Sequence, residues 1–220
     1  MFINNDIPFS VLMYLDAGDS DSYPGTGTTW SDLTDNNNDG TLINGPTFTN
    51  QFIPVIEFDG IDDYVSCPDV LGGLIEFSVE IWFNVNVNST GQEHWLVSQY
   101  LGGGDGRLIL DLFLDRTLRF FINGNSINSN TVISTNTWYN VVFTRNSSGI
   151  ASIYINGVED ANGNVGTEPV LSENFEIFDS TFISGVAVNG KIGLIKAHDE
   201  ELTSQEVLQN YNDTKSRFGL

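Results

Sequence analysis

Carboxylates are the side chains of this 220-residue chain with the most evident chemical potential, because they are numerous and unevenly spread. The first 106 residues hold 16 Asp and Glu residues and no Lys or Arg, and all eight basic residues follow. Crowded carboxylates repel one another unless water or a hard cation such as Ca²⁺ compensates their charge. The distribution therefore predicts either an acidic, solvated surface or a cation site built from the first half of the chain.

One acidic segment follows a calcium-loop pattern in part. Residues 35–40 read Asp-Asn-Asn-Asn-Asp-Gly, which places oxygen-bearing side chains at every second position, as in an EF-hand. The twelfth position of such a loop should be Glu and is Pro46 here, so the segment is not an EF-hand. A turn rich in Asn, Asp and Gly is the simpler interpretation. Other acids precede and follow it in the sequence: Asp16, Asp19, Asp21, Asp59, Asp62 and Asp63.

The spacing of the acids does not indicate hydrolysis. Glycosidases use two carboxylates roughly 5–10 Å apart, a separation that acids at positions i and i+2 of one strand would provide. No predicted strand has such a pair: Glu80 is alone in its strand, and Asp111 and Asp115 are four residues apart. Serine-hydrolase and zinc-binding motifs are absent from the sequence as well. We expect no enzymatic activity, and a carboxylate pair from two different strands is the alternative.

Three aromatic residues are candidates for a sugar-binding surface. Trp82 falls out of phase with the apolar face of its predicted strand, and Trp95 and Tyr100 precede a glycine-rich loop. Aromatic faces beside planar polar groups suit carbohydrate ligands. The alternative is that a two-layered β-structure buries these rings.

Short strands must position these side chains. Residues 77–85 alternate between apolar and polar, as a strand with one face on a core does. Asn-Gly pairs at 123–124 and 156–157 suit the positive φ angles of hairpin turns. The other predicted strands are 52–58, 63–66, 94–99, 107–114, 117–123, 138–146, 150–155, 175–178, 182–184 and 191–197.

A capping box, Thr203-Ser204-Gln205-Glu206, predicts the start of a short C-terminal helix. The many short strands, with no internal repeat and no Pro-rich linker, predict one all-β domain over residues 1–220. We expect a β-sandwich of two antiparallel sheets that carries this helix.

The overall charge and the termini restrict the partners. A formal net charge of −21 excludes recognition of a phosphate backbone as the main task and disfavours anionic membranes. We therefore expect neither nucleic acid nor a membrane as partner. Cys67 is the sole cysteine and cannot form an intrachain disulfide. The N-terminus lacks the basic region of a secretory signal, which predicts a protein made in a cytoplasm and not exported by that route.

Five segments, in order, resemble the laminin G-like modules of the concanavalin A-like lectin/glucanase superfamily. They are the opening from Tyr14 to Phe48, the Phe58-Asp59-Gly60 signature with the following Asp62 to Val65, the strand from Phe77 to Phe83, the hairpin from Trp138 to Gly157, and the closing strand and helix from Gly190 to Asn212. The resemblance covers nearly the whole chain.

This resemblance implies a jelly roll of two packed antiparallel sheets, often with a structural Ca²⁺ at one edge. The ion ligands that it implies in this chain are Asp16 and Asp59. The Glu-x-Asp-x-x-Glu strand of the glucanase branch is absent, so the resemblance favours binding over hydrolysis.

The opening Leu15-Asp16-Ala17-Gly18 and the ending Asn210 to Phe218 also resemble versions of this module encoded by tailed bacteriophages, marine ones in particular. The implied function is a non-enzymatic virion protein, a head decoration or fibre-associated domain, that touches host-surface glycans. Its localisation would be the virion. Its partners would be capsid or tail proteins, host-surface glycans and further copies of the chain. Two alternatives are a calcium-dependent carbohydrate-binding accessory module of a bacterial surface system and a degenerate glycosidase.

Overall fold

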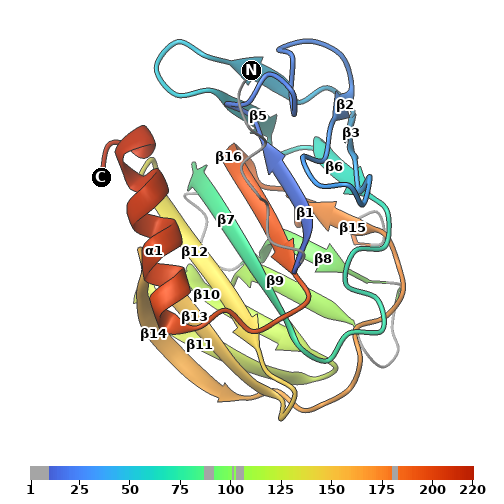
Figure 1. The fold of residues 1–220 in the computed structure, drawn as a ribbon, viewed down its shortest axis with the longest axis vertical. Helices are drawn as coiled ribbons and strands as arrows, with labels where there is room; N and C mark the ends of the chain where they lie inside the picture. Colours follow the sequence, from blue (N-terminus) through green and yellow to red (C-terminus); the bar gives the residue numbers. More distant parts are fainter. Residues whose placement is uncertain (1–9, 87–91, 101, 103–106, 180–182) are drawn as a thin grey trace.

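The computed structural model describes residues 10–86, 92–100, 102, 107–179 and 183–220. Within these residues, sixteen strands form two eight-stranded antiparallel sheets, and an α-helix and a 3₁₀ turn follow near the C-terminus (Figure 1). The expected all-β sandwich with a C-terminal helix is confirmed. No helix in the described residues is long and apolar enough to cross a membrane.

In both sheets, strands that are distant in the sequence pair with each other, such as β7 with β16 and β8 with β15. Sheet A runs β14-β13-β12-β7-β16-β5-β4, and β1 also pairs with β16. Sheet B runs β11-β10-β9-β8-β15-β6-β3-β2. The strands of sheet A are β1 (Val11–Asp16), β4 (Thr47–Thr49), β5 (Val55–Asp59), β7 (Phe77–Val85), β12 (Trp138–Arg145), β13 (Ile150–Ile155), β14 (Val158–Asn164) and β16 (Asn189–His198). Those of sheet B are β2 (Thr29–Trp30), β3 (Gly40–Ile43), β6 (Tyr64–Cys67), β8 (His94–Gln99), β9 (Leu108–Leu112), β10 (Thr117–Ile122), β11 (Asn125–Val132) and β15 (Phe175–Ile177).

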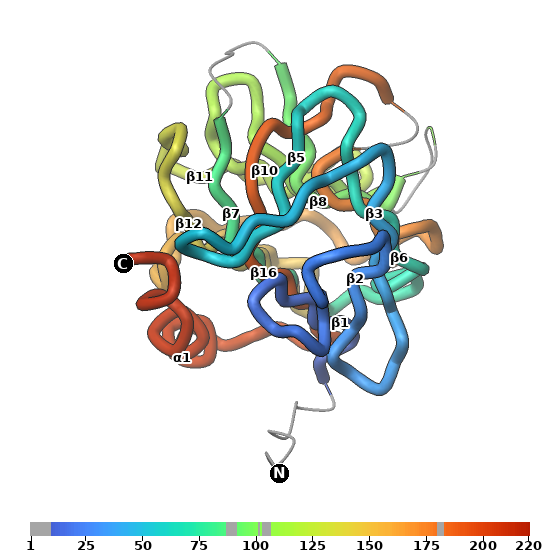
Figure 2. Tube along the Cα trace, turned by 90° about the horizontal axis from the view of Figure 1, so that it is seen from above, coloured from blue at the N-terminus to red at the C-terminus, as the bar shows by residue number. Residues whose placement is uncertain are grey.

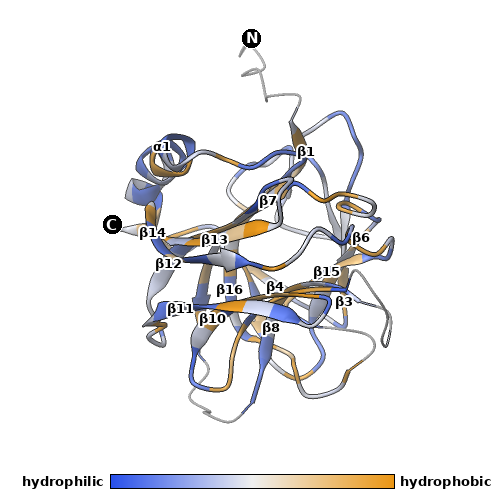
Figure 3. Ribbon diagram, turned by 90° about the horizontal axis from the view of Figure 1, so that it is seen from below, coloured by the Kyte–Doolittle hydropathy of each residue, from blue (hydrophilic) through white to orange (hydrophobic). Residues whose placement is uncertain are grey.

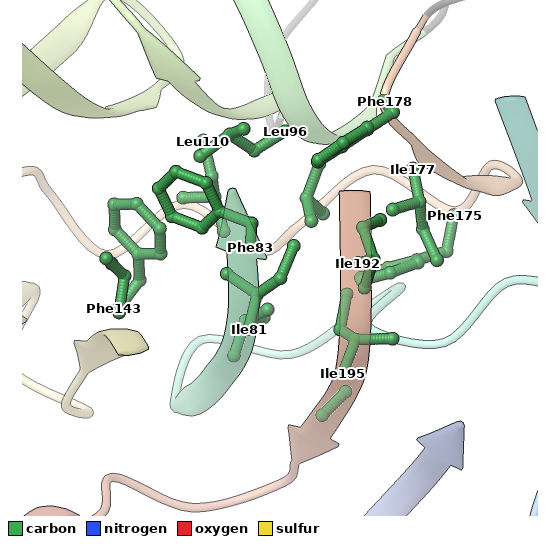
Figure 4. Packing of buried hydrophobic residues seen from close by; sticks show 14 of the residues in the cluster. Ile81, Phe83, Leu96, Leu110, Phe143, Phe175, Ile177, Phe178, Ile192 and Ile195 are labelled. Atoms are coloured by element: carbon green, nitrogen blue, oxygen red, sulfur yellow. The ribbon is translucent and has the colours of Figure 1, made fainter. Parts of the chain in front are cut away.

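The alternation in β7 explains how the layers pack. Its residues at odd positions from 77 to 85, which the sequence assigns to a core face, are all buried in the main apolar cluster. Figure 4 shows Ile81 and Phe83 of β7 facing Leu96 and Leu110 of sheet B. Residues at even positions of β7 therefore point to the outer face of sheet A, which carries the site described below.

The polar sequence of β11 and β14 shows no apolar alternation, so it does not predict these strands. Both are rich in asparagine and partly exposed, and each lies at the edge of its sheet. An edge strand pairs on one side only and buries less of its surface. The strand predicted at 182–184 lies partly outside the described residues, and Ile183 and Ser184 are not in a strand.

Helix α1 (Ser204–Thr214) and the 3₁₀ turn η1 (Lys215–Phe218) lie on the outer face of sheet A (Figures 2 and 3). The predicted capping box is present. The Glu206 amide donates to Thr203 Oγ1 at 3.3 Å, and the Thr203 amide donates to Glu206 Oε2 at 2.8 Å. α1 packs on β12, β13 and β14, and Phe218 of η1 packs on β7 and β16. The end of this face formed by β4, β5 and the start of β16 stays open.

Candidate functional site

The Phe58-Asp59-Gly60 signature lies at the end of β5 and packs against the start of β16, where Asp59 pairs with Asn189. Phe58 is buried in the core, and Gly60 adopts a positive φ of 76°. A Cβ on Gly60 would lie 2.7 Å from Cβ of Asn189, so only glycine permits this close approach. The Asn189 side-chain amide donates to the Asp59 carbonyl oxygen at 2.7 Å. The signature therefore places Asp59 at the outer end of sheet A.

Three carboxylates gather at this turn. Asp59, Asp62 and Asp63 each offer an oxygen atom, and these atoms lie within 4.8 Å of one another. Asp63 is buried, and its Oδ2 accepts from the Asp59 amide at 3.0 Å. Burial, followed by the charges of Asp59 and Asp62, raises the pKa of Asp63, while that hydrogen bond opposes the shift. Three hard oxygen donors in this spacing suit a cation such as Ca²⁺.

A row of five side chains crosses the outer face of sheet A beside this cluster. Neighbouring strands pair Thr47 of β4 with Glu57 of β5, and Glu57 with Lys191 of β16. Lys191 then pairs with Asn84 of β7, and Asn84 with Trp138 of β12. With strands about 4.8 Å apart, the row is about 19 Å long. Figures 1 and 2 show the end of β7 beside the start of β16 in this part of the sheet.

An open cleft follows the row. Its larger part, of about 580 Å³, lies between the row and the acidic cluster and is lined by five asparagines. Its smaller part, of about 310 Å³, is lined by Phe52, Ile53 and Trp138. Glu57 and Lys191 line both parts, so the two are adjacent. The five asparagines are Asn44, Asn84, Asn86, Asn136 and Asn189. We call this cleft the outer groove.

The polar end of the outer groove holds amides that are available to a ligand. Among the described residues, the side chains of Asn84, Asn86 and Asn136 make no hydrogen bond, whereas Asn44 and Asn189 donate to carbonyl oxygens. The opposite end is aromatic, with Phe52 95% exposed and Trp138 partly buried against Phe218 at a ring-centroid distance of 4.8 Å. The groove thus combines amide donors and acceptors with apolar ring surface.

Asp16, predicted to bind a metal ion, is engaged by an arginine instead. Arg217 Nη1 lies 2.6 Å from Asp16 Oδ1, and the Tyr14 hydroxyl donates to Asp16 Oδ2 at 3.1 Å. A Cβ on Gly18 would lie 2.4 Å from Arg217 Nη2, so this glycine makes room for the guanidinium. The charge of Asp16 is compensated within the chain.

The two predicted metal ligands are also far apart. Asp59 pairs with Asn189 and Asp16 pairs with Leu194, five residues farther along β16. At about 3.3 Å per residue, this separates them by about 17 Å along the strand. The pair expected from the resemblance is therefore corrected: Asp59 meets Asp62 and Asp63, and Asp16 does not join them.

Trp82 points away from the core of the sandwich, as its phase in β7 predicts, but no part of it is exposed. Phe218 stacks on its ring at 4.1 Å, Tyr211 is stacked at 5.9 Å, and its Nε1 donates to Thr214 Oγ1 at 2.9 Å. The C-terminal segment covers the ring of Trp82 and leaves no room for a ligand on it. Trp82 is a packing residue in this structure.

Trp95 and Tyr100 lie together on the other sheet. Their ring centroids are 5.3 Å apart with an interplanar angle of 80°, and Trp95 is only 2% exposed. Ile109 and Val186 complete this cluster on the outer face of sheet B. The structure thus brings two of the three predicted aromatic residues together and separates both from the outer groove. The rings that line the groove are Phe52 and Trp138.

The half-matching calcium pattern at 35–40 forms a hydrogen-bonded turn. The carboxylate of Asp32 accepts from the amides of Tyr14 and Asn38, each at 2.9 Å. The side-chain amides of Asn36 and Asn38 donate to the Leu12 carbonyl oxygen at 3.1 and 2.8 Å. The simpler interpretation of this segment as a turn agrees with these contacts, which attach it to β1.

One carboxylate pair from different parts of the chain does meet, on sheet B. Arg119 Nη2 lies 2.9 Å from Glu93 Oε2 and 2.5 Å from Asp111 Oδ2, and its Nε donates to Asp111 Oδ1 at 3.0 Å. Burial raises the pKa of Asp111, while the guanidinium of Arg119 opposes the shift. Asp111 has no exposed surface. A proton-transferring carboxyl group must reach its substrate, so this arrangement is that of an ion-pair network.

The sequence held a partial signal for the groove. Asn84 and Trp138 are out of phase with the core-facing residues of their strands, which marks them as pointing outward. The alignment of these two with Lys191, Glu57 and Thr47 depends on the pairing of five strands and has no local signature.

Comparison with known proteins places this fold. A family model described as the concanavalin A-like lectin/glucanases superfamily matches residues 59–208. A search of the curated proteins found no match.

Several solved structures are similar to this one. Domain 4 of AbnA, a GH43 extracellular arabinanase from Geobacillus stearothermophilus solved in complex with arabinotriose, has a TM-score of 0.73 at 16% identity and covers 91% of this chain and 97% of its own. Trypanosoma rangeli sialidase in complex with sialic acid has a TM-score of 0.72 at 15% identity and covers 96% of this chain, which spans 34% of the sialidase. The binding domain of Paraclostridial Mosquitocidal Protein 1 has a TM-score of 0.69 at 14% identity, covering 93% of this chain and 52% of its own. At these identities the likeness concerns the fold.

Proposed function

This chain belongs to the concanavalin A-like lectin/glucanases superfamily, and we propose that it binds carbohydrate in the outer groove without cleaving it. The observation that carries the proposal is the groove itself, in which exposed ring surface and unengaged amides lie along one row of paired residues. Sugars present apolar ring faces and hydroxyl groups at once, so they match such a surface. Superfamily membership alone would not support it, since one fold hosts many functions.

The asparagine side chains at the polar end of the groove would orient a bound sugar. An asparagine side chain carries two donors and an acceptor, and it can therefore bond adjacent hydroxyl groups that themselves donate and accept. Asn84 lies in the row itself, and Asn86 and Asn136 lie on the side of the acidic cluster. The aromatic end supplies contact area, because Phe52 and Trp138 offer flat apolar surface at low conformational cost.

Binding without hydrolysis is supported by the ion pairs of Glu93, Asp111 and Glu57. On sheet B, Glu93 and Asp111 both form ion pairs with Arg119, and Asp111 has no exposed surface. In the groove, Glu57 is held by Lys191 at 2.9 Å. Release of reducing sugar from any polysaccharide by the purified protein would overturn this part of the proposal.

We also propose that the cluster of Asp59, Asp62 and Asp63 holds a structural Ca²⁺, in which case carbohydrate binding depends on calcium. The residues fit a hard cation, because all three supply oxygen atoms and two of them are exposed. An ion that binds only the folded state raises the melting temperature. Chelation by EDTA is expected to lower the melting temperature and calcium to restore it, with Asp62→Asn unresponsive; an equal response in the variant would contradict the assignment.

The decisive experiment for carbohydrate binding is a glycan array probed with the wild type and two groove variants. Phe52→Ala and Asn84→Ala remove one contact at each end and are expected to weaken binding by about tenfold each. Val158→Ala on β14 is the matched control, because Val158 is 66% exposed and lies at the far edge of sheet A. Absence of binding to every glycan, or equal binding by all variants, would refute the proposal.

Two settings for this function are proposed. An accessory module is supported by the solved neighbours, since the arabinanase domain is a part of a larger enzyme and this chain spans a third of the sialidase. A virion protein that touches host-surface glycans and assembles with capsid or tail proteins rests on the resemblance of the opening and closing segments. Proteomics of purified phage particles separates the settings, because absence from the particles would remove the second.

A further inference from the structure

We propose that the outer groove takes an uncharged glycan chain of several sugar units, laid across β4, β5, β16, β7 and β12, and rejects acidic chains. This inference rests on the proposed carbohydrate binding and adds the class of carbohydrate.

The charge of the groove is the first argument. Glu57, Asp59 and Asp63 line it, and Asp62 adjoins it. Among the described residues that line the groove, Lys191 is the only cation, and its Nζ is 2.9 Å from Glu57 Oε1. A carboxylate or sulfate on a bound sugar would therefore meet several like charges and one cation that already has a partner.

The part of the sequence that forms the groove walls adds to the negative charge of the groove. β4, β5 and the turn after them come from the first 106 residues, which contain no Lys or Arg. A divalent cation at the acidic cluster would be held by three carboxylates and would leave the groove without net positive charge. Selectivity of this kind comes from repulsion of the wrong ligand, because the amides themselves bond neutral and acidic sugars alike.

The length of the groove is the second argument. Its two parts meet over Glu57 and Lys191, and both parts are open to solvent. The row beneath spans about 19 Å between β4 and β12. A single sugar ring can occupy the amide end or the aromatic end, whereas only a chain contacts Asn84 and Phe52 together. Affinity should therefore grow with chain length.

The test uses one polysaccharide in three chemical forms. A neutral glycan that binds in the array is compared with the same glycan after its primary alcohols are oxidised to carboxylates, and with the methyl ester of that product. The ester controls for the change of shape, because it restores neutrality without restoring the alcohol. Dissociation constants are measured at low and high salt, with calcium and with EDTA, and for a ladder from the single sugar to the hexasaccharide.

We expect the oxidised glycan to bind at least about tenfold more weakly than its ester at low salt, with the gap narrowing at high salt. Glu57→Gln frees Lys191 and should narrow the gap too. The matched control Glu200→Gln removes an exposed acid beyond the opposite end of β16 and should leave the gap unchanged. Phe52→Ala should lower affinity for the longer oligosaccharides more than affinity for the single sugar.

Equal or tighter binding of the oxidised glycan, with or without calcium, would overturn the charge argument. A single sugar that binds as tightly as its hexasaccharide would overturn the chain argument. In both cases the proposed carbohydrate binding would stand. Failure of every form of every glycan to bind would instead refute the proposed function.

Discussion

Substitution of Phe218 tests the explanation for the burial of Trp82. The ring of Phe218 is 3% exposed and stacks on Trp82 at 4.1 Å with an interplanar angle of 10°. It also contacts Trp138 at 4.8 Å. Phe218→Ala removes both contacts and opens the face of Trp82 that the C-terminal segment now covers.

The magnitude follows from the burial of the ring. Replacing a buried Phe by Ala costs about 3–5 kcal/mol, and the lower end applies because Phe218 lies near the end of the chain and not between the sheets. We therefore expect a loss of about 3 kcal/mol in the free energy of unfolding. At about 2–4 °C per kcal/mol for a domain of this size, the melting temperature should fall by about 6–12 °C.

Two further variants make this result interpretable. A Cβ on Gly193 would lie 2.3 Å from the Phe218 ring, so Gly193→Ala should displace the ring and cause a loss of similar size. Leu220→Ala, at a residue 47% exposed, should change stability by less than about 0.5 kcal/mol. Urea unfolding and acrylamide quenching of tryptophan fluorescence measure the two effects. If Phe218→Ala were as stable as Leu220→Ala and quenched like the wild type, the packing argument would be refuted.

Two other predictions concern buried titratable groups. Burial is the largest effect on His198 and lowers its pKa from 6.5 to about 4, although the charge of Glu80 opposes the shift. Between these pH values the unfolded chain therefore binds more protons than the folded protein does. The free energy of unfolding should fall by about 3 kcal/mol as pH drops through this window. Urea titrations of His198→Phe should show a smaller fall, and an identical fall would contradict this. Cys67 is 2% exposed and burial raises the pKa of its thiol, so a thiol reagent should modify one group per chain only at denaturant concentrations that unfold it. Rapid labelling of the native protein would show that the strands around Cys67 open locally.

Much of the fold was predictable because its signals are local. The alternation in β7 predicts which of its residues face the core between the sheets, and the capping box predicts the first residue of α1. Both Asn-Gly pairs adopt the predicted positive φ angles, with 48° and 89° at Asn123 and Gly124. In each case one residue and its near neighbours decide the geometry, through side-chain phase, a cap or a steric limit on φ.

The candidate site was predictable only in part, because it depends on contacts between distant segments. The sequence identifies Asp59 as a candidate ion ligand, and the neighbouring Asp62 and Asp63 join it through a single turn. The family resemblance pairs Asp59 with Asp16, and the structure corrects this because an ion pair with Arg217, 201 residues later, engages Asp16.

The sequence by itself determined a two-layered β-structure, its principal turns, its C-terminal helix and a strongly acidic first half. Only the tertiary structure decided which outward-facing side chains stay accessible. Phe218 covers Trp82, which lies 136 residues earlier, whereas the pairing of five strands leaves Asn84 and Lys191 open in one row. The physical reason is that alternation sets the face on which a side chain lies, while strand register and the packing of the C-terminal segment set what covers that face.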